Sequence, residues 1–343
     1  MLNLLLSVLI GRNRNAMCVV RPPGHHAGVN GLLDGGESCG FCIFNNIAAG
    51  ALHAISDERL LCERCAIVDI DVHHGNGTEE IVKKCHDPGK LFFFSIHLYD
   101  NEKKKPKGNA FQYKFYPGTG AEDDVAYNII NVALTPLWKE PQEKAAGNTH
   151  NTRQKTRSKV AASDSMSMDD SASDVGTPRD RDSGKFSDAE SETASSTNRE
   201  RSPPFSPSGQ SSSSPSNSGR HAYRQAIQNR LLPALRAFNP DLILISAGFD
   251  AARADVGNAR HERSGERMGL DLEPEDYAWT TRKVLEVADI CCQGRVVSVL
   301  EGGYGRSPSN GQGALDRSNL AECAARHVHA MVDPYDCEGR FST

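Results

Sequence analysis

Short, uninterrupted apolar runs recur along this chain and alternate with segments of helical pattern. The runs at 242–245 (Leu-Ile-Leu-Ile) and 296–299 (Val-Val-Ser-Val) are the clearest examples. A strand with one face in water would alternate apolar and polar residues, so these runs predict strands that are buried on both faces. The pattern favours an α/β fold with three layers, in which helices cover both faces of an open, mostly parallel sheet.

The same pattern predicts the individual elements. We expect strands at 17–21, 66–71, 91–97, 241–246 and 295–300, and helices at 44–55, 78–84, 222–238 and 274–291. The apolar stretch 2–10 is too short to span a bilayer and lacks the features of a signal peptide, so we interpret it as the tail of a buried helix. In an open parallel sheet the functional site lies at the carboxyl ends of the strands.

A segment rich in Ser, Asp, Arg and Pro separates two blocks of this pattern. It has few large apolar residues, so it cannot bury enough surface to offset the entropy of ordering it. We predict one domain, with an N-terminal part at 1–138, a disordered Ser-rich insertion at 139–220, a C-terminal part at 221–335 and a tail at 336–343.

Composition bears on the environment and the partners. The chain has 10 cysteines and no persuasive secretory signal, which indicates a reducing compartment, the nucleus and/or the cytoplasm. The net charge of −5 provides no global basic field, so we expect no direct, sequence-specific binding to nucleic acid. We also expect no membrane association.

The strand end at 69–77 (Asp-Ile-Asp-Val-His-His-Gly-Asn-Gly) carries the most specific chemistry. Because side chains alternate along a strand, Asp69, Asp71 and His73 are predicted to share one face. Carboxylate and imidazole groups suit Zn²⁺ or a similar divalent ion. This motif therefore predicts a metal-assisted reaction.

Three other predicted strands also end in reactive residues. His25 and His26 follow the first strand in a turn braced by Pro and Gly, where they are either proton carriers or solvated surface residues. Asp250 and Tyr304 follow the last two strands, the latter in a Gly-rich turn. One such residue alone carries no signal, but four strand ends of this kind indicate a single site.

Together these motifs resemble the zinc-dependent histone deacetylase family, with its arginase/deacetylase-like fold. The resemblance rests on the motifs at 21–27, 40–46, 69–77, 95–97, 117–120, 247–250 and 301–304, which occur in the family's order. The Arg-Pro-Pro-Gly-His-His form of the first motif and Asn76 are similar to the class II branch. Family members carry a longer stretch before this motif, so we expect that the start of the domain is missing.

The resemblance implies that Asp71, His73 and Asp250 hold one catalytic zinc ion and leave a position open for water and substrate. Such an ion polarises an acetyl carbonyl and lowers the pKa of its bound water. His26 matches the family's general base and acid, and His25 matches its partner imidazole.

Three further roles are implied by the resemblance. Asp69 matches the carboxylate that orients His25, and Asn76 would orient His26. An amide supplies no negative charge, so we expect His26 to be less basic than it would be beside a carboxylate. Tyr304 matches the phenol that donates to the developing oxyanion.

The resemblance also implies a narrow tunnel for a lysine side chain, and therefore acetylated histone tails or other acetyl-lysine proteins as substrates and corepressor-type complexes as partners. The residues expected to bind substrate are Gly40, Phe41, Tyr116, Gly302 and Gly303. A structural potassium site is implied at Asp69, Asp71, His73, Ser95 and Ile96. The alternative for Ser95 is a hydroxyl that caps the backbone at a strand end.

Several alternatives remain open. The substrate could instead be a small acetylated amine such as a polyamine, or the chain could be a truncated, catalytically impaired interaction protein. The Cys-x-x-Cys pairs at 39–42 and 62–65 are close to the spacing of a structural zinc site, although packed thiols are favoured. The basic run 103–107 is either a solvated loop or a nuclear import signal, and no tunnel-wall residue can be placed within 256–270.

Overall fold

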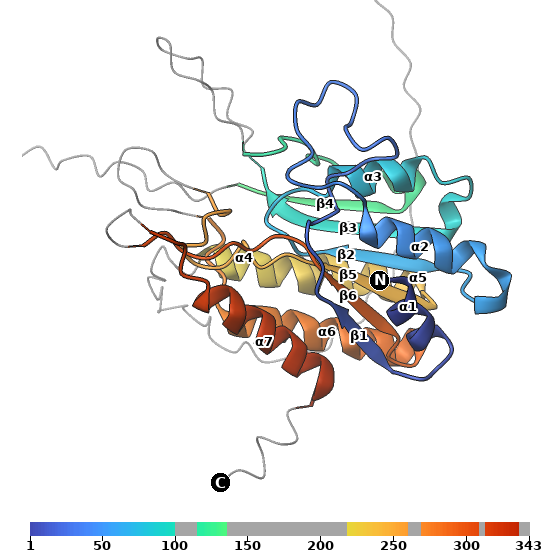
Figure 1. Ribbon diagram of the computed structural model, residues 1–343. Helices are drawn as coiled ribbons and strands as arrows, with labels where there is room; N and C mark the ends of the chain where they lie inside the picture. Colours follow the sequence, from blue (N-terminus) through green and yellow to red (C-terminus); the bar gives the residue numbers. More distant parts are fainter. Residues whose placement is uncertain (100–114, 136–217, 260–268, 309–312, 336–343) are drawn as a thin grey trace, which may run out of the picture. The chain divides into compact units, whose positions relative to one another are not determined.

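The computed structural model describes residues 1–99, 115–135, 218–259, 269–308 and 313–335 (Figure 1). The basic run at 103–107, the tail and most of the predicted insertion lie outside these residues. The structure corrects one boundary of the insertion, because residues 218–220 are helical and are joined to the helix that follows them.

The described residues form one parallel sheet of six strands, which confirms the predicted fold class (Figure 1). The order is β1–β6–β5–β2–β3–β4, and each neighbouring pair is parallel. The strands are β1 (Asn15–Cys18), β2 (Cys65–Asp69), β3 (Leu91–Leu98), β4 (Ile129–Leu134), β5 (Leu242–Ala247) and β6 (Val296–Leu300).

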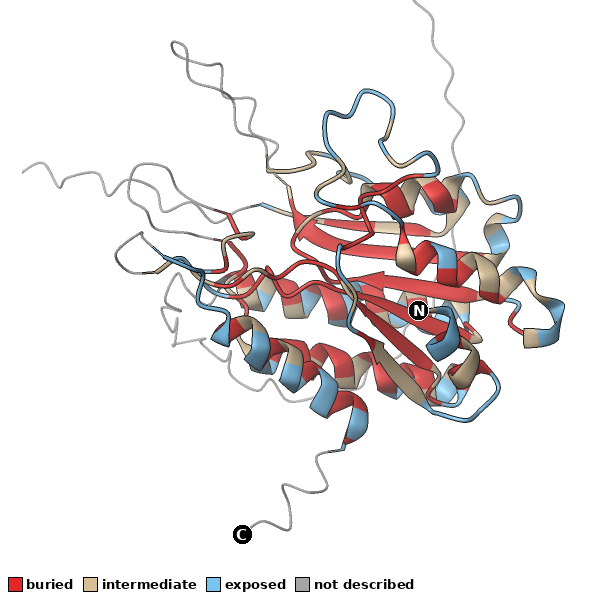
Figure 2. Cartoon of the chain, in the orientation of Figure 1, coloured by how far each residue is buried: buried red, intermediate tan, exposed pale blue. Residues whose placement is uncertain are grey.

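The sheet separates two hydrophobic clusters, and successive residues of a strand face different clusters. In β3, Phe92 and Phe94 belong to one cluster and Phe93 belongs to the other. In β5, Ile243 and Leu244 are divided in the same way. Because both faces of the central strands are buried (Figure 2), their sequences are continuously apolar rather than alternating.

Helices cover both faces of the sheet. One cluster includes residues of α4 (Ser218–Ala226), α5 (Leu232–Phe238), α6 (Pro274–Cys292) and α7 (Ser318–Val332). The other includes residues of α1 (Leu2–Leu9), α2 (Asn46–Ser56) and α3 (Asn76–Lys83), so the apolar stretch near the start is a helix with a buried face, as predicted. In the described parts of the chain, no helix is long and apolar enough to cross a membrane.

The structure differs from the predicted elements at several points. The strand predicted at 66–71 ends at Asp69, and the helix predicted at 222–238 begins at Ser218 and contains a π-helical turn at Ile227–Leu231. Strand β4 and helix α7 were not predicted. Helix α7 buries polar residues such as Asn319 and His327, which weakens the apolar periodicity that would reveal it.

The first turn of α2 is joined to the turn that carries the two adjacent histidines. The side chain of Asn45 accepts a hydrogen bond from the backbone N–H of Ala48 at 3.0 Å, which caps the helix. Its amide nitrogen donates to the carbonyl oxygen of Ala27 at 2.9 Å and to Thr78 Oγ1 at 3.0 Å. One buried amide therefore fixes the histidine turn relative to both α2 and α3.

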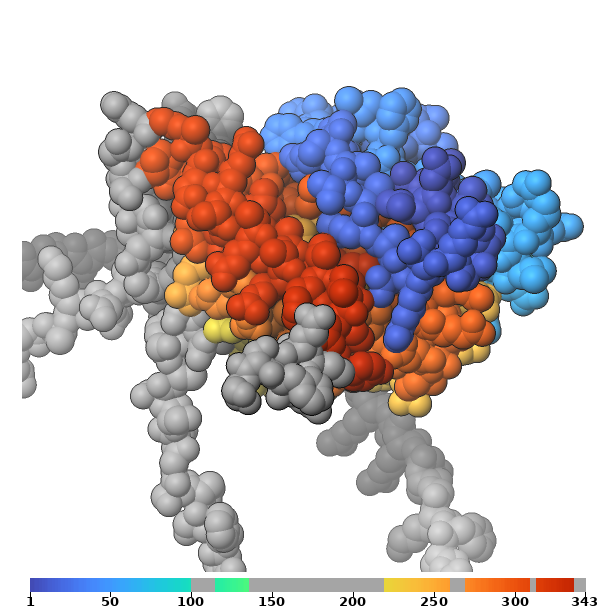
Figure 3. Space-filling view, turned by 60° about the horizontal axis from the view of Figure 1, so that its bottom comes forward, coloured from blue at the N-terminus to red at the C-terminus, as the bar shows by residue number. Residues whose placement is uncertain are grey.

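A buried histidine connects α7, whose outer side is visible in red in Figure 3, to the sheet. The His327 ring lies with Nδ1 2.6 Å from Thr281 Oγ1 and Nε2 2.8 Å from Ser298 Oγ. The Thr281 hydroxyl donates to the carbonyl oxygen of Tyr277 at 2.7 Å, so Thr281 accepts from Nδ1–H and Ser298 donates to Nε2. Burial lowers the pKa of His327 from 6.5 to about 4, so the ring is neutral in the folded protein.

We predict that this histidine makes folding stability depend on pH in the acidic range. Its pKa is lower in the folded state, so the unfolded chain binds the extra proton and the free energy of unfolding falls as pH decreases from 6.5 towards 4. Between pH 7 and pH 4.5 the loss attributable to His327 is about 2 kcal/mol. Urea unfolding of the wild type and of His327→Phe at both pH values measures this decrease in the free energy of unfolding. An equal decrease in the two proteins would contradict the prediction.

Candidate metal centre and active site

Polar side chains converge at the carboxyl edge of the central strands. Asp69 ends β2, and Asp71 and His73 follow it in the next turn. Asp250 follows β5, and Glu301 follows β6. Because β2, β5 and β6 lie side by side in the sheet (Figure 1), residues that are far apart in sequence meet at this edge.

The prediction that Asp69, Asp71 and His73 share one face of a strand is wrong. Strand β2 ends at Asp69, and Asp71 and His73 lie in the bend that follows. The backbone N–H of Val72 donates to Asp250 Oδ1 at 2.9 Å, which ties this bend to the end of β5. The residues are brought together by the turn and not by the alternation of a strand.

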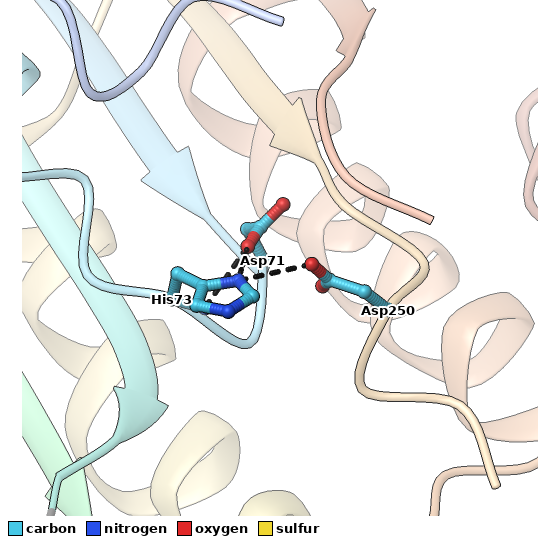
Figure 4. A group of neighbouring side chains, drawn as sticks. All are labelled: Asp71, His73 and Asp250. Atoms are coloured by element: carbon cyan, nitrogen blue, oxygen red, sulfur yellow. Dashed lines mark hydrogen bonds and ion pairs between the residues drawn. The ribbon is translucent and has the colours of Figure 1, made fainter. Parts of the chain in front are cut away.

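Asp71, His73 and Asp250 form a compact group of possible metal ligands (Figure 4). One ligand atom from each lies within 4.8 Å of the others. His73 Nδ1 is 3.1 Å from Asp71 Oδ1 and 3.0 Å from Asp250 Oδ2. Both carboxylates are buried, and the three side chains come from two different strand ends.

Backbone groups hold the carboxylates in place and leave no room for larger residues. Asp71 Oδ2 accepts from the N–H of Gly302 at 2.8 Å. A Cβ atom on Gly302 would lie 2.4 Å from this oxygen and 2.3 Å from Asp250 Oδ2, and one on Gly248 would lie 2.1 Å from Asp71 Oδ2. The two glycines therefore allow the carboxylates to pack directly against the backbone.

The electrostatics of this group suit a divalent cation. Burial and the neighbouring charge of Asp71 raise the pKa of the Asp250 carboxyl to about 6. Burial opposes charge on His73, but Asp250 and Asp71 outweigh it and raise the pKa of the imidazole to about 9. Two carboxylates and one imidazole nitrogen form a donor set that fits a zinc-type ion with an open coordination position.

His25 is paired with two of the motif's carboxylates. Its Nδ1 lies 2.9 Å from Asp69 Oδ2, and its Nε2 lies 3.8 Å from Asp71 Oδ1. Burial alone would lower the pKa of His25, but the charges of Asp69 and Asp71 raise it well above 6.5. His25 is therefore a cation at neutral pH.

His26 has a different partner and the opposite shift. Its Nδ1 lies 2.8 Å from Asn76 Oδ1, so Nδ1–H donates to the amide oxygen and Nε2 is left without a proton. Burial and the neighbouring charges of His25 and His73 lower the pKa of His26 well below 6.5. A neutral imidazole whose Nε2 can accept a proton is the form that a general base requires.

Glu301 holds the turn that carries the two histidines, a role that the sequence did not reveal. Its buried Oε2 accepts from the backbone N–H of Gly24 at 2.6 Å and from that of His25 at 3.1 Å. Arg21 donates to the carbonyl oxygen of Glu301. The partners are far apart in sequence, so only the presence of Glu beside the Gly-Gly-Tyr motif could have suggested the contact.

Aromatic rings surround the ligands and the histidine pair. The ring of Tyr116 meets His26 edge to face, with centroids 4.9 Å apart, and its hydroxyl donates to the carbonyl oxygen of Ser38 at 2.9 Å. Phe115 stacks on His73 with centroids 4.9 Å apart and an interplanar angle of 9°. Sequence reasoning missed Phe115, although its position beside Tyr116 was a signal.

Tyr304 and Phe41 lie together at the same site. Their ring centroids are 6.1 Å apart, and the guanidinium carbon of Arg21 is 5.6 Å from the centroid of Tyr304. Burial raises the pKa of the Tyr304 phenol, and the charges of Asp250 and Asp71 raise it further. The phenol therefore remains protonated at neutral pH and can act as a hydrogen-bond donor.

The remaining predicted residues divide into two groups. Gly40 and Gly303 both adopt a positive φ, and a Cβ on Gly40 would lie 2.3 Å from the His26 ring, so Gly40 packs directly on the proposed base.

The residues predicted for a potassium site include Ser95, which pairs with Asp69 in the sheet and whose hydroxyl bonds His97 Nδ1 at 2.9 Å. Ile96 is buried beside Ser95. These contacts do not support a potassium site, which stays a prediction.

The two Cys-x-x-Cys pairs do not form a metal cluster in the described ranges. Among the described residues, the group of side chains close enough together to hold a metal ion is Asp71, His73 and Asp250. Cys42 Sγ accepts from the backbone N–H of His26 at 3.4 Å, and Cys62 Sγ contacts the carbonyl oxygen of Arg64. These thiols are packed, as favoured from the sequence.

Comparison with known proteins places this chain in a family. A family model described as the histone deacetylase domain matches residues 1–162 and 210–314. The chain is 29% identical over 331 residues to "Type-2 histone deacetylase 2" of Dictyostelium discoideum, a match that covers 94% of this chain and 13% of that protein. It is 30% identical over 320 residues to "Histone deacetylase 6" of Caenorhabditis elegans, covering 93% and 22%.

A plant relative and a solved structure are also similar to this chain. "Histone deacetylase 15" of Arabidopsis thaliana is 29% identical over 339 residues, a match that covers 97% of this chain and 40% of that protein. A solved structure described as "Crystal Structure of HDA15 HD domain" matches with a TM-score of 0.54 and 24% identity, covering 96% of this chain and 61% of that chain. The chain spans less than half the length of each of these curated relatives.

We predict that the wild type binds one zinc ion per chain and that Asp71→Ala abolishes stoichiometric binding, because the remaining two ligands cannot complete the donor set. Asp69→Asn should retain the ion with affinity weakened about 10- to 100-fold, since Asp69 Oδ1 accepts from the backbone N–H of the ligand Asp71 at 3.1 Å and only helps to orient it. Zinc titration followed by elemental analysis measures both. Stoichiometric zinc in Asp71→Ala would show that the ligand set is wrong.

Proposed function

The chain belongs to the histone deacetylase family, with class II-like features, and we propose that it hydrolyses acetyl groups from lysine side chains of histones or other proteins with a zinc ion held by Asp71, His73 and Asp250. The observation that carries this proposal is the convergence of the metal-type ligands with His25 and His26. At this edge of the sheet, the pKa of His25 is raised and the pKa of His26 is lowered.

Zinc, when bound, supplies a Lewis acid that polarises the acetyl carbonyl and makes water more acidic. His26, neutral at physiological pH, accepts a proton from the attacking water at Nε2 and later donates it to the leaving amine. His25 remains charged beside Asp69 and stabilises negative charge that develops near it.

The remaining groups orient and enclose the substrate. The protonated phenol of Tyr304 donates to the oxygen that becomes an oxyanion. The rings of Phe41 and Tyr116 form walls for the aliphatic stem of the lysine. Gly302 leaves space beside the two carboxylates, and Gly303 follows it in the same turn. Acetylated histone tails are the proposed substrates, corepressor-type complexes the proposed partners, and the nucleus or cytoplasm the proposed location.

We predict zinc-dependent release of acetate from acetyl-lysine peptides. His26→Ala should lose at least about 100-fold in kcat, the usual contribution of a positioned proton carrier, while it retains zinc and folding. Steady-state assays with and without a chelator measure this. A folded, zinc-loaded wild type that is no more active than His26→Ala would contradict the enzyme proposal, and faster turnover of an acetylated polyamine than of peptides would favour the small-amine alternative.

A second prediction concerns the partner of His26. In Asn76→Asp a carboxylate replaces the amide oxygen that lies 2.8 Å from Nδ1, so the pKa of His26 should rise. The base form then requires a higher pH, and the acidic limb of the profile of kcat/KM against pH should move up by about 1 unit. Asn13→Asp, an exposed substitution of the same kind, is the control. An unmoved acidic limb in Asn76→Asp would show that Asn76 does not tune the base.

A further inference from the structure

The segment 115–120 carries two rings that contact the proposed reacting groups. Phe115 stacks on His73, one of the metal-type ligands, and Tyr116 packs edge to face on His26. Both ring pairs have centroids 4.9 Å apart. The position of this short segment therefore determines the shape of the wall beside the ligands and the base.

Two buried imidazoles hold the far end of the segment. His74 Nδ1 lies 2.8 Å from Thr119 Oγ1, and His97 Nε2 lies 3.0 Å from the carbonyl oxygen of Gly120. Gly120 has a φ of +80°, and a Cβ atom there would lie 2.6 Å from atoms of both rings. The backbone of the segment thus packs directly against the two imidazoles with no side chain between them.

His74 is itself anchored by a carboxylate of α3. Its Nε2 lies 2.9 Å from Glu79 Oε2, and Glu79 also accepts from Lys83 at 2.7 Å and from Asn131 at 2.8 Å. Burial alone would raise the pKa of Glu79, but these donors outweigh it and lower the pKa to about 2. The Nε2 of His74 is therefore held by the Glu79 carboxylate, and its Nδ1 bonds the Thr119 hydroxyl.

His97 is fixed in a single orientation by its partners. Burial and the neighbouring charge of His74 lower the pKa of His97 well below 6.5, so the ring is neutral. Its Nε2–H donates to the carbonyl oxygen of Gly120, and its Nδ1 accepts from the Ser95 hydroxyl at 2.9 Å. The ring therefore links β3 to the backbone of the segment.

We propose that His74, Glu79, His97, Thr119 and Gly120 form a loop clamp that positions the aromatic wall and so determines how tightly the stem of an acylated lysine is held. This inference rests on the proposed function. The clamp acts on the stem only through Phe115 and Tyr116, so its members are positioning residues. Loosening it should weaken ligands that fill the tunnel and leave metal chelation unchanged.

The test uses the zinc-loaded protein and two hydroxamates, which chelate zinc without being hydrolysed. One carries an alkyl stem that is as long as a lysine side chain, and the other is acetohydroxamate, which has no stem to contact the wall. Thr119 is exposed, so Thr119→Val removes its hydroxyl at constant shape without disturbing the core. Thr119→Ser retains the hydroxyl and is the matched control.

Binding is measured by calorimetry. In Thr119→Val the dissociation constant of the long hydroxamate should rise about 5- to 10-fold, the effect of one lost hydrogen bond. That of acetohydroxamate should stay within about 2-fold, and Thr119→Ser should bind both ligands like the wild type. Equal weakening of the two hydroxamates, or no weakening of the long one, would overturn the proposal.

A second pair of variants tests the other end of the clamp. Glu79 and Glu80 are neighbours in α3, and each pairs with the lysine four positions later, but only Glu79 contacts His74. Glu79→Leu should reproduce the selective loss of the long hydroxamate, and Glu80→Leu should not. An equal effect in both variants would assign the result to helix stability and contradict the clamp.

The outcome is distinguishable from failure of the proposed function. If the wild type releases no acetate from peptides but Thr119→Val still weakens binding of the long hydroxamate alone, the deacetylase proposal is wrong and the clamp proposal is supported. If acetate is released and the two hydroxamates are affected alike, the deacetylase proposal holds and the clamp is wrong. In the clamp variants, the KM of an acetyl-lysine peptide should rise together with the dissociation constant of the long hydroxamate, and kcat should change less than KM.

Discussion

The burial of several carboxylates at one edge of the sheet is the constraint on which the rest of the structure depends. Asp69, Asp71 and Asp250 are each at most 1% exposed, and an unpaired buried charge is too costly to persist. Imidazoles and backbone N–H groups compensate them, with His25 against Asp69 and Gly302 N–H against Asp71. The fold is therefore organised to supply these partners from adjacent strand ends.

This constraint ties the site to the order of the sheet. The hydrogen bond from Val72 N–H to Asp250 joins the ends of β2 and β5, and Glu301 joins the end of β6 to the turn after β1. A change in strand order would separate these groups, whereas a change in a distant loop would not. The glycines at 248 and 302 belong to the same constraint, because a Cβ at either position would displace a carboxylate.

The sequence predicted the parts of the molecule whose signals are local. Continuous apolar runs located the central strands, and the resemblance to a family assigned Asp71, His73 and Asp250 before their proximity was known. Helix α7 was not predicted because its buried face includes Asn319 and His327, whose partners lie in other elements. Glu301 and Phe115 were missed because their contacts span large sequence separations, so the only sequence signals were their positions beside the Gly-Gly-Tyr motif and Tyr116.

The two His-His pairs use one physical device. In each pair, consecutive rings enter different networks: His25 contacts Asp69 while His26 contacts Asn76, and His73 faces the metal-type ligands while His74 contacts Glu79. One ring of each pair, His25 or His74, is bonded to a carboxylate, so the backbone that carries the other ring is fixed as well. The carboxylate of the first pair contacts His25, while the partner of His26 is the uncharged amide of Asn76, so no carboxylate bonded to His26 raises the pKa of this neutral base.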